Sequence, residues 1–408
     1  MSDYELRMIP AEDILPYRRL SSILFRAKVW NDGEDEETVI RKHREADAEQ
    51  GEYFFRIGAY LDGTLYAAQE VLNYDIYFDG QPCRMSGIGG VISDFNSPKK
   101  GALKQIYARS FEIMREQKQY ISHLYGFEES YYRQYGYDVS TQCAKWRIPL
   151  DKTRFVRYGL VKGYDDSPEM QEDIRRVFLQ FAKQHNLFTI RSGKNWENFL
   201  KSRSNYTTDH ASFVHYTDGT PDAFFSYIAE PQGELTQNLA VTELWYTDLA
   251  ALRGVLSYFE TQRPYGDHLI LPLPENVDLS PVLNNWAGWG KRNVERTICN
   301  TGVSRVVDAE EVLKMARYKG EGSVCIRIYD DIYAPWNNDC FTVTFGRETT
   351  VTRGGTPDIE MTINAFSSGI LGRIDSENLP LFTDVKIHNA ANLDKVFYQK
   401  PLWIEEHF

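Results

Sequence analysis

Glycines gather in a short stretch of the chain, ahead of a predicted helix. Residues 85–93 read MSGIGGVIS and form part of a predicted strand, and the helix is predicted over residues 101–117. Glycine weakens a strand unless another group approaches its backbone closely. The free amides and dipole of a helix N-terminus suit a diphosphate, and Lys99 and Lys100 could supply countercharge. The pattern fits a phosphate-bearing cofactor, and it fits equally a bulged strand followed by solvated lysines.

Tyrosines gather in a second segment, residues 130–137, which follows a predicted strand ending at Tyr125. Four of these eight residues are tyrosines. A phenol with its ordinary pKa of about 10 is protonated at pH 7. Such a group could donate a proton to a leaving thiolate as a general acid. The alternative is packing between domains, which we expect for Tyr135 and Tyr137.

Charge and composition limit the classes of partner. The formal net charge of −12 disfavours nucleic acid, because phosphate binding needs a basic surface. It suits a cationic substrate, although acidity can also serve solubility alone. The five cysteines are widely spaced without a CxxC pair, which fits a reducing compartment and no structural zinc. With no signal peptide and no apolar run of about 18 residues, we expect a soluble, cytoplasmic protein with no membrane partner.

Several domains must position these residues, because a single core stops growing near ~250–300 residues and the chain has 408. Residues 1–150 read as a helix, antiparallel strands, the glycine-rich strand, a helix and a strand. Residues 151–300 repeat that layout without repeating the sequence, which indicates a degenerate duplication; within them, residues 284–300 read as a connector. Residues 301–408 read as an α+β unit, a helix followed by strands.

The two chemical segments together resemble those of GNAT acetyltransferases, in which a splayed strand and the next helix bind CoA. The whole chain is similar to one branch, the enhanced-intracellular-survival (Eis-like) family. GIGGV at residues 87–91 is similar to the CoA strand of that branch, and YRQYGY at 132–137 to its YRxFGY segment. SRVVD at 304–308 and APWNN at 334–338 resemble its third-domain signatures. The aromatic ending at 398–408, YQKPLWIEEHF, resembles its C-terminus.

The resemblance implies a mixed α+β fold. Two tandem GNAT folds, a catalytic one over residues 1–150 and a degenerate one over 151–300, would precede a sterol-carrier-protein-like domain over 301–408. It implies an N-acetyltransferase that moves the acetyl group of acetyl-CoA directly to an amine, without a metal. The amine would be aminoglycoside-like, a polyamine or a lysine side chain. Assembly into a homo-oligomer, commonly a hexamer, is also implied.

The resemblance also assigns site residues. Tyr132 is expected to protonate the CoA thiolate, and the carboxylate of Phe408 is expected to act as general base. The residues expected to bind the cofactor are Ile88, Gly89, Gly90, Val91, Ile92, Ser93, Lys99, Lys100, Gly101 and Ala102.

The phosphate loop departs from the superfamily pattern R/Q-x-x-G-x-G/A. Pro98 stands at the Arg/Gln position and lacks an amide proton, and Leu103 stands at a small-residue position. In the second unit, residues 243–248 are bulky where glycines would be expected. Two alternatives stay open: a catalytically silent binding or scaffold protein of the same architecture, and a carrier of hydrophobic ligands that uses the third domain.

Overall fold

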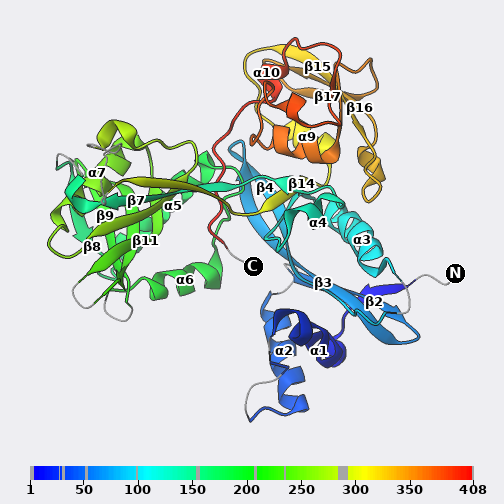
Figure 1. Cartoon of the computed structure of the whole chain (residues 1–408), viewed down its shortest axis with the longest axis horizontal. Helices are drawn as coiled ribbons and strands as arrows, with labels where there is room; N and C mark the ends of the chain where they lie inside the picture. Colours follow the sequence, from blue (N-terminus) through cyan, green and yellow to red (C-terminus); the bar gives the residue numbers. More distant parts are fainter. Residues whose placement is uncertain are drawn as a thin grey trace.

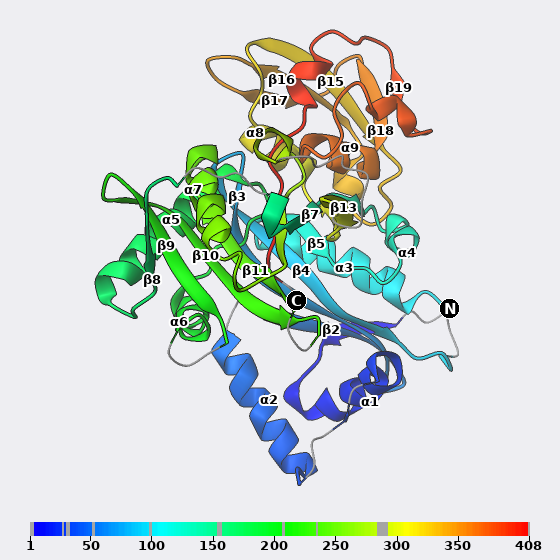
Figure 2. The same cartoon turned by 60° about the vertical axis from the view of Figure 1, so that its left-hand side comes forward.

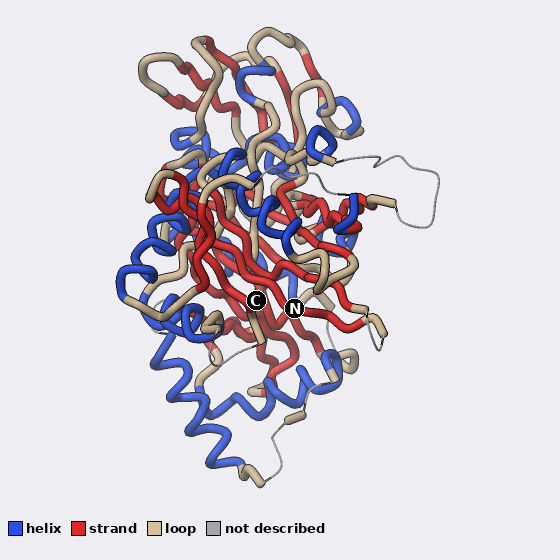
Figure 3. Tube along the Cα trace, turned by 90° about the vertical axis from the view of Figure 1, so that its left-hand side faces the viewer, coloured by secondary structure: helices blue, strands red, loops and turns tan. Residues whose placement is uncertain are grey.

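A computed structural model describes residues 4–26, 28–29, 33–50, 54–97, 100–152, 157–205, 209–233, 236–283 and 293–406. Figure 1 shows three units: two built on large sheets that lie side by side, and a smaller one above them. Figure 3 shows strands of the large sheets running through the middle of the molecule, with helices around them. The mixed α+β fold is therefore confirmed, with two units built on seven-stranded sheets followed by a smaller unit on a five-stranded sheet.

The first unit is built on a sheet with strand order β1-β2-β3-β4-β5-β14-β6. The strands are β1 (Glu5–Met8), β2 (Phe54–Leu61), β3 (Thr64–Phe78), β4 (Gln81–Ser93), β5 (Gln119–Leu124), β6 (Asp138–Val139) and β14 (Val303–Val306). β4 and β5 pair in parallel, and the other neighbours pair antiparallel. The predicted turns at Asp62-Gly63 and Asp79-Gly80 are confirmed, since all four residues have positive φ and such residues favour tight hairpins.

The helices of the first unit are η1 (Ala11–Asp13), α1 (Ile14–Phe25), α2 (Glu36–Gln50), α3 (Ala102–Glu116) and α4 (Glu129–Arg133). On α3, Ile106, Ser110 and Met114 are fully buried, which places one face of the helix on the sheet. α2 was not predicted, because its sequence is mostly charged and only Val39 among its described side chains is buried.

The second unit repeats this arrangement, with strand order β13-β7-β12-β11-β10-β9-β8. Its strands are β7 (Gln142–Pro149), β8 (Leu160–Gly163), β9 (Ala211–Thr217), β10 (Thr220–Pro231), β11 (Gln237–Tyr246), β12 (His268–Pro274) and β13 (Glu295–Asn300). Its helices are η3 (Leu150–Lys152), α5 (Pro168–Gln184), α6 (Gly193–Ser202), α7 (Leu249–Thr261) and η4 (Ser280–Val282). β11 and β12 pair in parallel, as β4 and β5 do in the first unit.

The third unit has a smaller sheet with strand order β17-β16-β15-β18-β19. Its strands are β15 (Gly322–Tyr329), β16 (Cys340–Phe345), β17 (Thr350–Arg353), β18 (Ile359–Thr362) and β19 (Lys386–Ile387). Its helices are α8 (Ala309–Met315), η5 (Pro335–Asn337), α9 (Ile363–Ile370), η6 (Leu379–Leu381) and α10 (Leu393–Val396). The apolar residues of this unit are packed into one buried cluster with residues of β3, β4 and β5.

The chain passes back and forth between the two large sheets. β7 joins the second sheet, and β14 returns to the first sheet between β5 and β6. The expected connector at residues 284–300 is wrong in its last part, because β13 is a strand that pairs with β7; residues 284–292 lie outside the described residues. The domain boundaries at 150 and 300 stay predictions.

A buried ion pair joins the three units. The Lys400 ammonium of the third unit lies 2.6 Å from Asp79 Oδ2 in the turn between β3 and β4. The other oxygen of Asp79 accepts a hydrogen bond from Asn186 Nδ2 of the second unit at 3.1 Å. The Arg317 amide of the third unit donates to Asp79 Oδ2 at 2.8 Å. Burial lowers the pKa of Lys400, so the interaction with Asp79 is what keeps a charge at this junction.

Candidate functional site

β4 and β5 separate in the middle of the first sheet. Their parallel pairing begins at Arg84 and Gln119 and stops at Ile88 and Leu124. Beyond Ile88, β4 runs on to Ser93, and of the described strands only β3 pairs with that part of it. A strand edge without a neighbour presents backbone N–H and C=O groups. The fork between β4 and β5 therefore offers main-chain hydrogen bonds to a ligand.

A β-bulge shapes this edge of β4. Gly89 pairs with Glu70 and Ile92 with Ala68, so one residue more lies on β4 than on β3 between these pairs. Gly90, inside the bulge, has a φ of 51°. A Cβ there would collide with the Tyr17 hydroxyl and lie 2.8 Å from Glu70 Cγ. Only glycine satisfies both the backbone angle and the space, which explains the glycine cluster in the sequence.

The N-terminus of α3 lies on the chain just after this edge. Gly101 is its N-cap residue, with a φ of 93°. No described side chain caps the helix, and its first turn contains no acidic residue. The first amides and the positive end of the dipole are thus available to an anion. Lys100 is exposed beside them, whereas Pro98 and Lys99 lie outside the described residues.

The side chain of Leu103, near the start of α3, is not fully exposed. It is partly buried and packs against the apolar cluster that contains Tyr4, Ile57 and Ile106. The unusual side chain at this position therefore has a place in the hydrophobic packing of the first unit.

Tyr132 lies at the fork. It is 4% exposed and belongs to the same buried cluster as Ile88 and Leu124, the last pair that joins β4 to β5. Gly126 makes room for its ring, since a Cβ there would lie 2.7 Å from Tyr132 Cδ2. In the described part of the chain, no residue forms a hydrogen bond with the Tyr132 hydroxyl. Burial, with a smaller contribution from Tyr131, raises its pKa to about 12, so the phenol stays protonated at neutral pH.

Tyr135 and Tyr137 of the segment are buried and contact residues of the first unit. Tyr135 stacks on Tyr107 of α3, with 3.9 Å between ring centroids. Tyr137 is fully buried, and its hydroxyl lies 2.7 Å from Ser122 Oγ. His123 of β5 is also buried, with Nδ1 2.8 Å from the Ser304 hydroxyl.

One side chain of β14 and one of the third unit hold the backbone around α4. Arg305 is fully buried and donates to the Tyr135 carbonyl at 2.6 Å. Asn364 Nδ2 donates to the carbonyls of Arg133 and Tyr137 at 3.0 and 2.9 Å. Sequence reasoning noticed the SRVVD motif that contains Arg305 but did not assign it this contact. No sequence pattern around Asn364, at the start of α9, indicated its contact.

The C-terminal tail reaches the fork from the third unit. Figure 2 shows it, in red, passing between the two large sheets. The Tyr125 hydroxyl donates a hydrogen bond to the Glu406 carbonyl, which places residue 406 directly after the end of β5. His407 and Phe408 lie outside the described residues.

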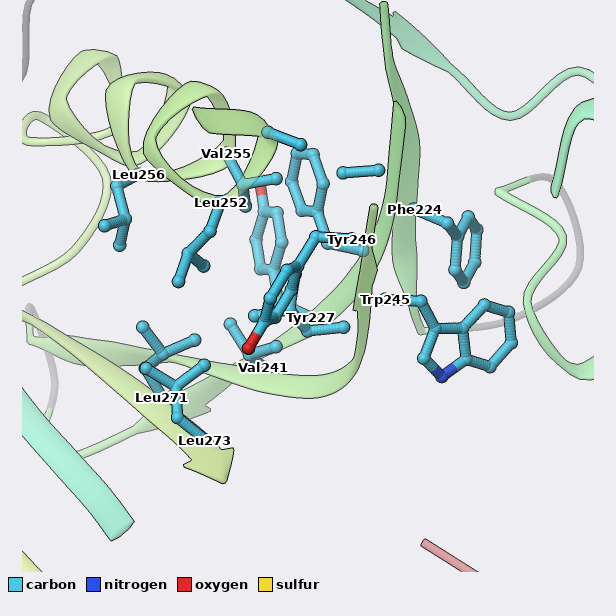
Figure 4. Close-up of a cluster of buried hydrophobic side chains, with 14 of the residues drawn as sticks. Phe224, Tyr227, Val241, Trp245, Tyr246, Leu252, Val255, Leu256, Leu271 and Leu273 are labelled. Atoms are coloured by element: carbon cyan, nitrogen blue, oxygen red, sulfur yellow. The ribbon is translucent and has the colours of Figure 1, made fainter. Parts of the chain in front are cut away.

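The corresponding fork of the second unit is filled. Parallel pairing of β11 with β12 stops at Ala240 and Ile270, and a bulge at Thr242 follows. In place of glycines, β11 continues with Leu244, Trp245 and Tyr246, which are buried. Figure 4 shows side chains of β10, β11, β12 and α7 in this apolar cluster. Large side chains therefore stand on β11 at the positions where β4 carries glycines.

The structure brings most of the predicted site residues into one region. Those on β4 and at the start of α3 are Ile88, Gly89, Gly90, Val91, Ile92, Ser93, Lys100, Gly101 and Ala102. Ile88 and Ile92 bury their side chains, so only their backbone could serve a ligand. Tyr132 packs beside Ile88. The roles of all these residues stay predictions. The described residues contain no group of three or more His, Cys, Asp or Glu arranged for a metal ion.

Comparison with family models adds the class of protein. Residues 21–140 match the acetyltransferase (GNAT) domain, the part of the chain that contains the fork and Tyr132. The first unit therefore contains an acetyltransferase domain of the GNAT type. Residues 309–405 match the sterol carrier protein domain. No curated protein sequence matches the chain.

Solved structures of low sequence identity share the whole fold of this chain. A conserved protein of unknown function from Enterococcus faecalis V583, described as a probable N-acyltransferase, is 20% identical, with a TM-score of 0.77 and 100% of each chain covered. A GCN5-related N-acetyltransferase from Anabaena variabilis is 17% identical, with a TM-score of 0.78 over 99% of this chain and 100% of that one. Eis1 from Mycobacterium abscessus is 18% identical, with a TM-score of 0.77 and the same coverage. At these identities the similarity concerns the fold alone. Among the described residues, no helix is both long enough and apolar enough to cross a membrane.

Proposed function

We propose that the protein transfers the acetyl group of acetyl-CoA directly to an amine, in the first unit. The observation that carries the proposal is the open edge of β4 between Ile88 and Ser93, with Tyr132 packed at the fork where that edge begins. An edge of this kind suits an extended, amide-containing chain such as pantetheine, because it can pair with it as a strand would.

The residues present fit acetyl-CoA. The bulge at Gly90 admits no side chain, and the helix start at Gly101 has no described capping side chain. The backbone of residues 88–93 would bind the pantetheine arm, and Lys99, Lys100, Gly101 and Ala102 would bind the diphosphate. When bound, the cofactor supplies an acetyl group activated as a thioester.

Tyr132 would act as the general acid. Its hydroxyl carries a proton at neutral pH because burial raises its pKa to about 12. It has no hydrogen-bond partner in the described part of the chain, so this proton is free to move to the leaving sulfur as the C–S bond breaks.

The Phe408 carboxylate would act as the general base. The tail is fixed at Glu406 by Tyr125, two residues before Phe408 in the sequence. A carboxylate placed there would accept one proton from the ammonium, which frees the nitrogen lone pair to attack the thioester carbon. The second proton leaves the nitrogen as the amide forms and restores the Tyr132 phenol, which has given its proton to the sulfur. The acceptor is proposed to be a cationic amine such as an aminoglycoside, a polyamine or a lysine side chain. Cytoplasmic location, a hexameric assembly and the absence of nucleic-acid partners stay predictions.

Calorimetric titration with acetyl-CoA tests the proposal. We expect a Kd in the micromolar range for the full chain, and a several-fold weaker Kd for Lys100→Ala, since a charge near a phosphate contributes on the order of 1 kcal/mol. Lys118→Ala, exposed two residues after the C-terminal end of the same helix, is the control and should bind as the wild type does.

A panel of amines is then tested as acetyl acceptors, and release of the CoA thiol is measured. Transfer to any amine, lost without acetyl-CoA, would support the reaction. Absence of acetyl-CoA binding would overturn the proposal and leave a silent protein with an acetyltransferase fold. Binding with no transfer to polyamines, aminoglycosides or lysine peptides would overturn the proposed acceptor class.

A further inference from the structure

The C-terminal tail lies against the second unit before it reaches the first. The Asn186 amide donates to the Pro401 carbonyl at 2.8 Å, and the Trp403 amide donates to the Asn186 carbonyl at 3.2 Å. Asn186 and Leu402 form a parallel β-bridge. The backbone of the tail is thus bound to the second unit as a short strand.

Glu405 anchors the tail by its side chain. One oxygen of its carboxyl accepts from Trp245 Nε1 at 2.8 Å, and the other accepts from Trp403 Nε1 at 2.9 Å. Trp245 is a fully buried residue of β11. Desolvation, together with the nearby Glu243, raises the pKa of the Glu405 carboxyl well above its usual range. Two indole N–H groups that donate to the two oxygens of one carboxyl group make a specific attachment point.

Arg191 connects this point to the last described residue. Its guanidinium lies 3.0 Å from Glu406 Oε2 and 3.3 Å from Glu243 Oε1. Arg203 lies 3.1 Å from the same Glu243 oxygen. The side chains of Arg191 and Glu243 are 12% and 6% exposed, so water competes little for these contacts.

The residues of β11 that bind the tail lie beside a bulge in that strand. Glu243 and Trp245 directly follow the bulge at Thr242 in β11. That bulge lies just past the end of the parallel pairing with β12, as the bulge at Gly90 does in β4. The strand position that forms an open backbone edge in the first unit carries tail-binding side chains in the second.

We propose that the second unit is the receptor of the C-terminal tail and that Arg191 and Glu405 are positioning residues for acetyl transfer. The link to transfer rests on the proposed function, in which the tail delivers the base. Residue 406 is held from both sides: its carboxylate by Arg191 of the second unit, and its carbonyl by Tyr125 of the first. Arg191 therefore helps to set where the last residues of the tail lie, and a shift of about 1 Å in a reacting group can lower a rate about 100-fold.

The test uses the full chain and two substitutions. Arg191→Met removes the ionic connection from Glu243 of β11 to Glu406 and leaves the contact of Glu405 with Trp245 in place. Glu406→Gln removes the outer half of that ionic connection, at a side chain that is 30% exposed. The matched control is Arg253→Met, an exposed arginine of α7 that lies over the Tyr158 ring. One readout is the rate at which carboxypeptidase shortens the tail, followed by intact mass. The other is kcat with the KM for acetyl-CoA.

We expect Arg191→Met to speed trimming at least about tenfold and to lower kcat about tenfold or more, because a loosened tail misplaces its end. The KM for acetyl-CoA should not change, since β4 and α3 bind the cofactor. Glu406→Gln should change both quantities in the same direction by less, and Arg253→Met should resemble the wild type. A purely structural role for Arg191 would not separate kcat from KM in this way.

Each other outcome decides a different statement. Unchanged trimming in both variants would overturn the proposal that the second unit is the receptor of the tail. Faster trimming with unchanged kcat would retain the receptor, overturn the positioning role and contradict the carboxylate base of the proposed function. If Arg191→Met does not fold, Glu406→Gln decides alone. If no amine is acetylated by the wild type, the proposed function fails, and trimming still tests the receptor.

Discussion

At the scale of single residues, the contacts of the ring and of the hydroxyl distinguish the tyrosine that could do chemistry from those that pack. Tyr135 and Tyr137 use their rings or hydroxyls within the core, whereas the Tyr132 hydroxyl has no bonding partner in the described part of the chain. The raised pKa of Tyr132 keeps it an acid over the whole physiological range.

Tyr132→Phe should therefore lower kcat about 100-fold or more, the usual contribution of a general acid. The KM for acetyl-CoA should change little, because the ring and its packing remain. Tyr131→Phe, on the same helix, is the control, since its hydroxyl lies 3.4 Å from that of Tyr135. Steady-state kinetics on both variants measures this, and a Tyr132→Phe enzyme as active as the wild type would exclude the acid role.

A second prediction at this scale concerns His215 of β9. Its two ring nitrogens face acceptors, with Nδ1 2.5 Å from Asp222 Oδ1 and Nε2 2.8 Å from the Tyr158 carbonyl. Only an imidazolium can donate to both. Burial lowers the pKa of His215, but the hydrogen bonds to Asp222 and to Tyr158 outweigh it, and the net pKa is raised above 6.5.

A raised folded-state pKa stabilises the protein fully below about pH 6.5 and less as pH rises through the folded-state pKa. The free energy of unfolding should fall between pH 6 and 9 by at most ~1.4 kcal/mol per pH unit from this group. Urea unfolding of the wild type and of His215→Gln across this range measures the difference. A difference that is independent of pH would contradict a charged His215.

At the scale of elements, the bulge in β4 restricts residue 90 in two ways: its φ is left-handed, and neighbouring side chains leave no space for a Cβ atom. Gly90→Ala should lower the free energy of unfolding by about 1–3 kcal/mol, since the new Cβ meets Glu70 at a left-handed φ. It should also abolish acetyl-CoA binding by shifting the open edge. Gly63→Ala, with a φ of 77° and nothing near its Cβ position, should cost only about 1 kcal/mol and leave binding intact. Chemical unfolding and calorimetry on the two variants separate strain from loss of the site.

At the scale of the whole molecule, Asp79 and Lys400 join the three units through one buried charge pair. Lys400→Met or Asp79→Asn alone should destabilise the protein by about 3–5 kcal/mol, because each leaves one buried partner uncompensated. The double variant should lose less than the sum. Thermal unfolding of the four proteins provides the coupling energy, and strict additivity would contradict a direct interaction.

The sequence predicted those parts of the fold that depend on neighbouring residues. The turns at Asp62-Gly63 and Asp79-Gly80, the glycine-rich strand and α3 all have local signals. β14 was missed because VSRV at 303–306 carries no sign of the distant strands β5 and β6 that it joins. Arg191 and Glu405 were not identified from the sequence for the same reason, because their partners lie far away in the chain. A charged side chain is expected on the surface until its neighbours are known.

The return of β14 to the first sheet has a consequence for synthesis of the chain. β14 lies between β5 and β6, yet the ribosome produces it only after β7 to β13 of the second unit. Until residue 306 has emerged, the first sheet contains a gap whose edges are unpaired and prone to association. Pairings of such long sequence separation also form slowly. During synthesis, the sheet of the first unit should thus stay incomplete until the second unit has also been produced. The protein should acquire its active form only near the end of translation.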